Sequence, residues 1–195
     1  MSSANPHNSS KNGLCEEECS LLHKVARASI EHGIETGRPL TVDIARYPHP
    51  LREPRATFVT LNEHGQLRGC IGSLEAVRPL VEDVAHNAYA AAFSDPRFPP
   101  LQASELADLD VHISVLSPAT PMQFHSEEDL IRQLRPGVDG LILEDGYHRG
   151  TFLPAVWESL PDPHDFLQHL KLKAGLPADY WSDTIRVSRY TTESF

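Results

Sequence analysis

The chain has 195 residues, of which 40% are hydrophobic, 23% charged and 7% aromatic, and its formal net charge is −10 at pH 7. This length is enough to bury one hydrophobic core, or two smaller cores in separate lobes. A DNA duplex carries one phosphate charge about every 1.7 Å, so a chain this acidic is repelled by nucleic acid unless it has a local basic patch. The densest basic stretch, "HLKLKAG", holds only two lysines. We therefore expect no nucleic-acid binding.

The sequence carries no signature of a membrane or exported protein. No window approaches the roughly 18 apolar residues that span a bilayer, and the N-terminal "MSSANPHNSSKNG" lacks the apolar core of a secretory signal. These polar residues, 1–13, are expected to form a disordered tail. Three cysteines, an odd number, without an export signal predict reduced thiols. We expect a cytoplasmic protein that contacts no membrane.

The N-terminal half predicts a helix, a β-hairpin and a second helix. The stretch 15–37 has apolar residues at helical spacing, and Gly37 stands where a C-terminal cap is expected. Three prolines make 46–56 a connecting loop. Two β segments across 56–72 follow, joined by a turn. The stretch 79–93 is an amphipathic helix that the prolines of "SDPRFPPL" terminate.

The C-terminal half continues the same mixture of strands and helices. Clean alternation of apolar and polar residues predicts a strand over 109–118. A short helix within 129–140 is expected to end near Gly137, and a hairpin around an Asp-Gly turn is expected within 140–154. A helix is expected within 162–176, with Asp165 or its neighbour near the N-cap and Gly175 past the end. A strand with a tail over 184–195 completes the chain. Hairpins interspersed with helices indicate an α+β fold of mostly antiparallel sheets flanked by helices.

The stretch "GQLRGCIGSLE" raises the first chemical question. Alternation along the predicted strand puts Arg68, Cys70 and Gly72 on one face, with the Arg68 side chain about 6–7 Å from Cys70. A guanidinium at that range favours the thiolate, and Gly69 and Gly72 would let a ligand approach the backbone. The alternative is that Cys70 is a small, partly buried hydrophobic residue, as free cysteines commonly are.

A nucleophilic cysteine needs a base within hydrogen-bond reach. His112 is the candidate, because it lies on the polar side of the strand predicted over 109–118. The half-exposed face of a sheet also explains a histidine there without any catalysis. No Asn or Asp is placed in the sequence as the third member of a triad with Cys70 and His112.

Cys15 and Cys19 are one helical turn apart and could face a metal only with further ligands. An iron–sulfur pattern would want a cysteine where Leu22 stands. We therefore interpret both cysteines as ordinary helix positions and predict no metal site.

Asp95 and Arg97 flank a proline in a rigid segment just after a predicted helix. They either pair with each other, or Arg97 presents its planar guanidinium to a carboxylate or phosphate. The sequence has no phosphate-binding Gly-rich loop, no Gly-x-Ser-x-Gly and no His-Glu-x-x-His.

Four segments together resemble one family. "FVTLNEHGQLRGCIGSLE", "NAYAAAFSDPRFPPL", "ISVLSP" and "FLPAVWESLPDPHDFLQHLKLKAGLPADYWS" are similar to the AMMECR domain, in its prokaryotic form the AmmeMemoRadiSam system protein A. The match runs in order from about Cys15 to Arg189, and the hexapeptide "LRGCIG" is the family's signature. The resemblance implies two subdomains around a cleft near the hexapeptide. We expect this domain over 14–190, with its subdomains interleaved in sequence, and a tail over 191–195.

The resemblance implies association with a Memo-type protein and a radical S-adenosylmethionine enzyme, but it brings no established reaction and no cofactor. The leading hypothesis is a cytoplasmic accessory protein with a cleft for a small molecule or peptide. The residues expected to line it are Arg68, Gly69, Gly72, Asn87, Asp95 and Arg97. One alternative is a transferase or hydrolase with Cys70 as nucleophile and His112 as base. The other is a non-catalytic adaptor.

Overall fold

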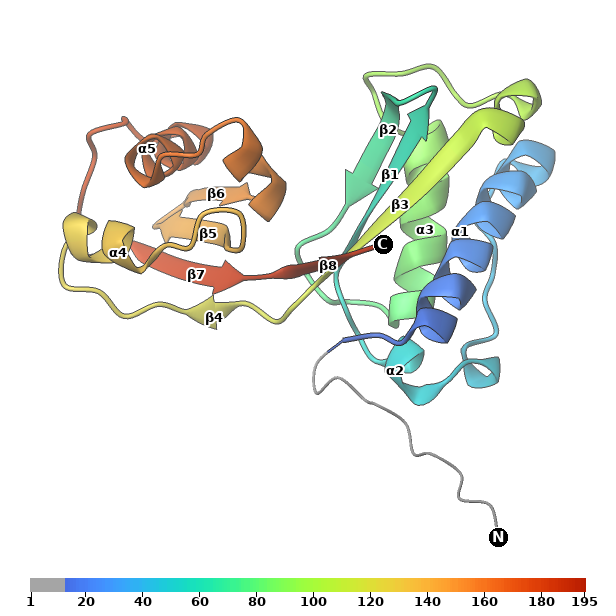
Figure 1. The fold of residues 1–195 in the computed structure, drawn as a ribbon, viewed down its shortest axis with the longest axis horizontal. Coiled ribbons are helices and arrows are strands. Elements are labelled where there is room, and N and C mark those ends of the chain that lie inside the picture. Colours follow the sequence, from blue (N-terminus) through green and yellow to red (C-terminus); the bar gives the residue numbers. More distant parts are fainter. Residues whose placement is uncertain (1–12) are drawn as a thin grey trace, which may run out of the picture. The chain divides into compact units, whose positions relative to one another are not determined.

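The computed structural model describes residues 13–195, which fold into two compact units. Unit 1 comprises 13–115 together with Glu193–Phe195, and unit 2 comprises Leu116–Thr192. Each unit holds one four-stranded antiparallel sheet and its own helices (Figure 1). The predicted α+β class with mostly antiparallel strands is therefore confirmed. The predicted N-terminal tail lies outside the described residues except for Gly13.

The sheet of unit 1 has the strand order β2-β1-β3-β8. Its strands are β1 (Thr57–Glu63), β2 (Gln66–Gly72), β3 (Leu109–Leu116) and β8 (Thr192–Ser194). The turn of the β1–β2 hairpin has positive φ at His64 (51°) and Gly65 (75°), as a tight hairpin turn requires. Phe195, beside β8, exchanges both backbone hydrogen bonds with Ile113. The residues 191–195, expected as a tail, therefore close the first sheet, and Phe195 packs against the core of unit 1.

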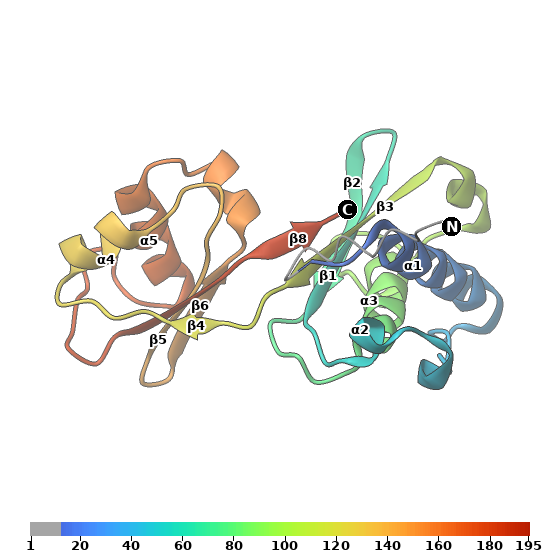
Figure 2. The same ribbon diagram turned by 60° about the horizontal axis from the view of Figure 1, so that its bottom comes forward.

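The helices of unit 1 cover one face of this sheet (Figure 2). They are α1 (Glu16–Thr36), α2 (His49–Arg52), α3 (Leu80–Phe93) and the 3₁₀ turns Ile44–Arg46 and Ala103–Asp108. Helix α3 packs on β1 and β2, and α1 packs on α3. The Ser29 hydroxyl ties the two helices by donating to the Ala85 carbonyl at 2.7 Å. Helix α1 ends, as predicted, at Gly37 in the left-handed conformation.

Unit 2 has the sheet order β4-β7-β5-β6. Its elements are β4 (Thr120–Pro121), α4 (Glu127–Gln133), β5 (Gly140–Asp145), β6 (His148–Phe152), the 3₁₀ turn Pro154–Glu158, α5 (Pro163–Lys173) and β7 (Arg186–Tyr190). Helix α4 begins earlier than expected, with Ser126 as its N-cap. It ends at Gln133 and not near Gly137, because Pro136 disfavours helical backbone at the residue before it. Helix α5 begins at Pro163 with Asp162 as its N-cap, whereas we expected the cap near Asp165.

The core of unit 2 is built around a stacked aromatic pair. Trp157 lies flat on Phe166, with 3.7 Å between ring centroids and 7° between planes. The Trp157 indole N–H donates to the Asp139 carbonyl at 2.7 Å, which satisfies its one polar group inside the core. Leu141 and Leu143 of β5 are fully buried in the same cluster.

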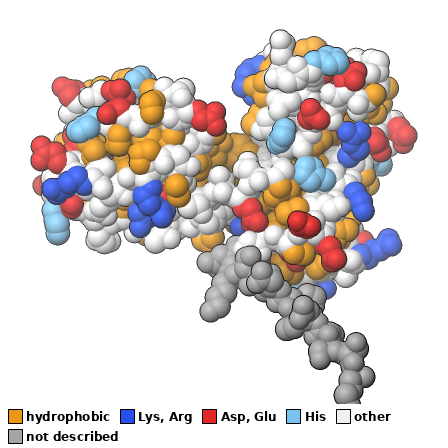
Figure 3. All heavy atoms as spheres, viewed as in Figure 1, with side chains coloured by type: hydrophobic (Ala, Val, Ile, Leu, Met, Phe, Trp, Pro, Cys, Tyr) orange, Lys and Arg blue, Asp and Glu red, His pale blue; other side chains and the backbone are white. Residues whose placement is uncertain are grey.

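The surface carries charges of both signs. On the face shown in Figure 3, acidic and basic side chains are scattered over both units and no continuous basic patch is present. No helix in the described part of the chain is long and apolar enough to cross a membrane.

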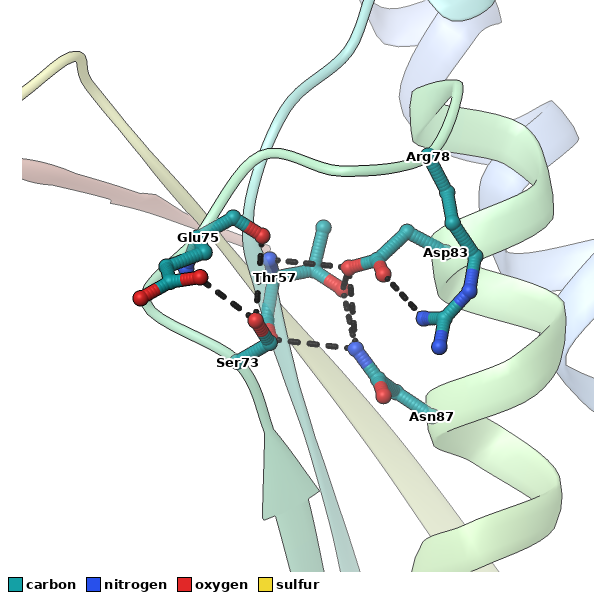
Figure 4. A network of polar contacts seen from close by, with 6 residues as sticks. All are labelled: Thr57, Ser73, Glu75, Arg78, Asp83 and Asn87. Atoms are coloured by element: carbon teal, nitrogen blue, oxygen red, sulfur yellow. Dashed lines mark hydrogen bonds and ion pairs between the residues drawn. The ribbon is translucent and has the colours of Figure 1, made fainter.

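A buried carboxylate joins the start of β1 to α3 (Figure 4). Asp83 is fully buried. Its Oδ2 accepts hydrogen bonds from the Thr57 backbone N–H (3.1 Å), the Thr57 hydroxyl (2.7 Å) and the Asn87 amide (2.9 Å). Its Oδ1 accepts from the Arg78 guanidinium at 2.9 Å. Asn87, which we expected to bind a ligand, therefore directs its amide N–H groups to Asp83 and Thr57.

Replacing Asp83 by Ala is expected to lower the free energy of unfolding by about 3 kcal/mol, because it removes the acceptor of the buried Thr57 backbone N–H and hydroxyl and the ion-pair partner of Arg78. Urea unfolding followed by circular dichroism measures this change. Glu82→Ala is the matched control, since it removes a carboxylate from the same first turn of α3. Equal losses in the two variants would contradict a special role of Asp83.

Candidate functional site

Cys70 lies in the middle of β2, the edge strand of the first sheet. The register aligns Cys70 with Thr60 on β1, and Thr60 in turn with His112 on β3. The Thr60 hydroxyl donates to the Cys70 Sγ at 3.1 Å. Val59 and Leu61, which flank Thr60, are fully buried toward α3. Cys70, Thr60 and His112 therefore form a row across three strands on the opposite face of the sheet.

The structure does not bring Cys70 and His112 into contact. Neighbouring strands lie about 4.8 Å apart, so two strand spacings, about 10 Å, separate these residues. The Thr60 side chain stands between them. Cys70 is half-buried and His112 is exposed. The predicted direct pair of nucleophile and base is therefore not formed, and Thr60, which the sequence analysis did not single out, is the partner of the thiol.

A β-bulge changes the predicted placement of Arg68. The register moves from Leu61↔Gly69 to Asn62↔Leu67, which leaves Arg68 as the extra residue on β2. Simple alternation groups Arg68 with Cys70 on one face of the strand and places Leu67 on the opposite face. Instead, Leu67 pairs with Asn62 and is 42% exposed, whereas Arg68 is only 9% exposed. One inserted residue thus reverses the predicted positions of both side chains.

The Arg68 guanidinium is held by a carboxylate and does not serve the thiol. Its Nε and Nη2 donate to the two oxygens of Glu105 at 2.6 and 3.2 Å. Its Cζ lies 6.0 Å from the Phe98 ring centroid. The hydrogen bond from Arg68 lowers the pKa of Glu105. Within the described chain, the buried Nη1 of Arg68 has no hydrogen-bond partner.

The two glycines of the hexapeptide are required by the protein's own packing. A Cβ on Gly69 would lie 2.1 Å from the Ala91 carbonyl oxygen of α3. A Cβ on Gly72 would lie 2.3 Å from the Phe58 ring and 2.4 Å from the Thr57 carbonyl oxygen. We expected these glycines to admit a ligand to the backbone. The space beside each of them is filled by protein atoms instead.

Asp95 and Arg97 hold the free edge of β2. The buried Asp95 carboxylate accepts the Cys70 backbone N–H at 2.9 Å. It also accepts two hydrogen bonds from the Arg97 guanidinium, at 2.7 and 3.0 Å. Arg97 Nη2 lies 3.4 Å from the Cys70 carbonyl oxygen, which it approaches as a donor. The pair therefore occupies both outward backbone groups of Cys70, in the way that a neighbouring strand would.

Cys15 and Cys19 lie one turn apart at the start of α1. Both are free thiols, Cys15 exposed and Cys19 half-buried at the start of α1. Burial, followed by the charge of Glu193, raises the pKa of Cys19. Among residues 13–195 no group of three or more His, Cys, Asp or Glu side chains is arranged to hold a metal ion.

Comparison with known proteins places this site in a family. A sequence model of AMMECR1 matches residues 23–195. The chain belongs to the AMMECR1 family. It is 40% identical over 188 residues to a protein of Methanothermobacter thermautotrophicus, covering 93% of this chain and 95% of that one. It is 35% identical to protein MJ0810 of Methanocaldococcus jannaschii, covering 93% and 91% of the two chains.

The AMMECR1-family fold is also present in a crystal structure, that of protein PH0010 from Pyrococcus horikoshii. The two structures agree with a TM-score of 0.83 at 36% sequence identity, over 93% of this chain and 92% of the other. The names of these relatives state no reaction, ligand or partner. The function of the hexapeptide therefore has to be argued from its geometry.

Gly69→Ala is expected to destabilise the protein by roughly 1–3 kcal/mol, because the new methyl group meets the backbone of α3 and forces β2 away from it. Thermal and urea unfolding both measure the loss. Leu67→Ala, at an exposed position of the same strand, is the control. Unchanged stability of Gly69→Ala would contradict the close packing of β2 on α3.

Acid pH is expected to weaken the wild-type protein more than the Asp95→Asn variant. The hydrogen bonds from Arg97, then those from the Cys70 and Arg97 backbone, hold the pKa of Asp95 well below its ordinary value. The unfolded chain therefore binds this proton first, at about pH 3.9, and the stabilisation that is complete above that pH is lost below it.

Urea unfolding between pH 6 and pH 3, on the wild type and on Asp95→Asn, tests this difference. Asp110→Asn, which alters an exposed carboxylate on β3, is the control and is expected to follow the wild type. If Asp95→Asn lost stability as steeply as the wild type, the Asp95 carboxylate would not be the group that titrates.

Proposed function

We propose that this AMMECR1-family protein is an accessory protein that binds a partner segment or small ligand on the sheet face of unit 1 that carries Cys70. The observation behind this is the row of Cys70, Thr60 and His112, three chemically different side chains on a face that α3 does not cover. Leu67, exposed on the same strand, adds an apolar contact. Binding sites are effective when such side chains stand on rigid elements.

The surroundings of the hexapeptide favour binding over covalent catalysis. Gly69 fixes β2 on α3, Asp95 holds its edge, and Arg68 is paired with Glu105. These groups support the strand and are not directed at the thiol. Among the described residues, the hydrogen-bond partner of the Cys70 Sγ is Thr60, and no His, Lys or carboxylate hydrogen-bonds to it. A cysteine nucleophile needs such a base in reach.

The partners that we propose are a Memo-type protein and a radical S-adenosylmethionine enzyme, as the family resemblance implies. In this proposal, the chemistry belongs to those proteins, and this chain contributes a rigid recognition surface. A folded sheet with satisfied edges can present such a surface without rearrangement, which lowers the entropic cost of association.

A second candidate function rests on the Thr60–Cys70 hydrogen bond. In a cysteine-dependent transferase or hydrolase, the Cys70 Sγ would attack an acyl carbon. The Thr60 hydroxyl, turned so that it accepts the thiol proton, would pass its own proton to His112. The leaving group, held at Cys70, would then be protonated by the Thr60 hydroxyl as His112 returns the proton to Thr60. The alignment of these three residues in one register row supports this order of transfers.

His112→Glu is expected to weaken binding of the Memo-type protein from the same genome by at least about tenfold, because it places an uncompensated charge on the proposed surface. His86→Glu, the same substitution at an exposed position of α3, is the matched control. Co-purification and isothermal titration calorimetry measure both. Wild-type affinity of His112→Glu, or no complex with the unmodified protein, would overturn the proposal.

Cys70→Ala distinguishes the two candidate functions. As an accessory protein, the variant retains partner binding within about tenfold, because it loses one small side chain. As a cysteine-dependent enzyme, it loses all covalent turnover. Loss of pathway activity with intact partner binding would favour the enzyme.

A further inference from the structure

Unit 2 holds a pocket that plays no part in the site on unit 1. Its volume is about 600 Å³, within the usual range for small-molecule sites. One wall is formed by residues 121–125, where the chain leaves β4, and the other by residues 181–188, which lead into β7. All of its lining residues belong to unit 2.

The apolar part of the pocket is aromatic. Phe124 and Trp181 both line it and contact each other as a tilted pair, with 5.7 Å between ring centroids and 58° between planes. Met122 and Val187 lie beside them and are almost completely buried. A flat ring is therefore the apolar group that these walls suit best.

A buried carboxylate fixes the loop that carries Trp181. Asp145, at the end of β5, is 8% exposed. It accepts hydrogen bonds from the hydroxyl groups of Tyr180 (2.8 Å), Ser182 (2.9 Å) and Thr184 (2.6 Å). Three anchors within five residues leave the loop little freedom, so the aromatic wall is formed before any ligand arrives.

A buried ammonium group supports Trp181 from within unit 2. Lys171 of α5 is fully buried, and its Nζ lies 5.7 Å from the centroid of the Trp181 ring. The same Nζ bonds to the Glu127 carboxylate and donates to the Ala178 carbonyl at 3.3 Å. A buried charge is costly unless it is fully paired. Its contact with the Trp181 ring helps to hold that ring in place.

The charged residues of the pocket are one cation and two carboxylates. Glu144 already pairs with Arg149 at 3.4 Å. Arg186 and Asp183 are exposed, and within residues 13–195 neither has an ion-pair partner. Asp183 and Arg186 lie at a turn of the chain, in which the Ile185 N–H approaches the Ser182 carbonyl oxygen at 3.4 Å. This turn brings the backbones of Asp183 and Arg186 close together. The pocket thus offers one uncommitted positive and one uncommitted negative group beside an aromatic wall.

We propose that this pocket binds a small amphoteric molecule with an aromatic ring, of the chemical class of the aromatic amino acids. The ring lies against Phe124 and Trp181. The carboxylate of the ligand pairs with the planar guanidinium of Arg186, which suits two parallel hydrogen bonds. The ammonium group of the ligand pairs with Asp183. A ligand with a single charge uses only one of these two groups.

Isothermal titration calorimetry on the full chain tests this with three matched probes. L-tryptophan carries both charges, indole-3-propionate lacks the ammonium group, and tryptamine lacks the carboxylate. L-tryptophan is expected to bind about tenfold more tightly than either of the others, as one charged hydrogen-bonded contact supplies about that factor. Equal affinities for the three probes, or no binding of any of them, would overturn the inference.

Two substitutions test which charged group of the ligand pairs with Arg186 and which pairs with Asp183. Arg186→Gln is expected to weaken L-tryptophan and indole-3-propionate about tenfold and to leave tryptamine unchanged. Asp183→Asn is expected to weaken L-tryptophan and tryptamine and to leave indole-3-propionate unchanged. Arg132→Gln makes the same charge change on the exposed side of α4, outside the pocket, and serves as the control. An effect of Arg132→Gln equal to that of Arg186→Gln would mean that only the net charge matters.

Trp181→Leu tests the aromatic wall and is expected to weaken all three probes together. Circular dichroism shows whether that variant is folded, and Trp181→Phe, which keeps an aromatic ring, is expected to recover most of the affinity. Binding that survives Trp181→Leu unchanged would place the probes elsewhere on the protein.

Discussion

The close contact between β2 and α3 at Gly69 is the constraint on which the arrangement of unit 1 depends. A hydrogen in place of a side chain lets the Ala91 carbonyl approach the strand where a Cβ would lie only 2.1 Å from it. Because the strand lies so near the helix, the segment directly after α3 reaches the edge of β2, and Asp95 can accept the Cys70 N–H. The bulge at Arg68 then turns that guanidinium toward Glu105. The position of the Cys70 thiol follows from these three contacts.

Much of the fold could be predicted because local signals agree with it. Helical spacing with Gly37 as cap defined α1, and the Asp-Gly turn defined the β5–β6 hairpin. Two features had no local signal. The bulge on β2 depends on how that strand meets β1, and it reversed the predicted positions of Leu67 and Arg68. The C-terminal strand β8 depends on pairing with β3, about 80 residues earlier in the chain, and such long-range pairing is invisible to patterns in a short window.

The sequence predicted which residues gather around Cys70 better than it predicted what each of them does there. The sequence placed Cys70 on a strand with His112 on another, but the register that inserts Thr60 between them belongs to the assembled sheet. Gly69 and Gly72 were read as openings for a ligand, whereas the structure fills both spaces with Ala91 and Phe58. A glycine that touches its own protein and a glycine that admits a ligand look alike in sequence. The neighbour that distinguishes them comes from another element.

The buried carboxylates of both units have structural roles. Asp83, Asp95, Asp139 and Asp145 are all at most 8% exposed, and each accepts several hydrogen bonds from its own unit. A carboxylate whose lone pairs are used in this way anchors a loop or a strand end, and releasing it for catalysis would cost the stability of that anchor.

The groups that still have free hydrogen-bonding or ion-pairing capacity are of a different kind. They are the half-exposed thiol of Cys70, the exposed imidazole of His112, and the charges of Arg186 and Asp183, which have no ion-pair partner among residues 13–195. The protein therefore uses its deepest polar residues to fix the framework, and the groups that we propose for recognition lie at partly solvated positions on that framework.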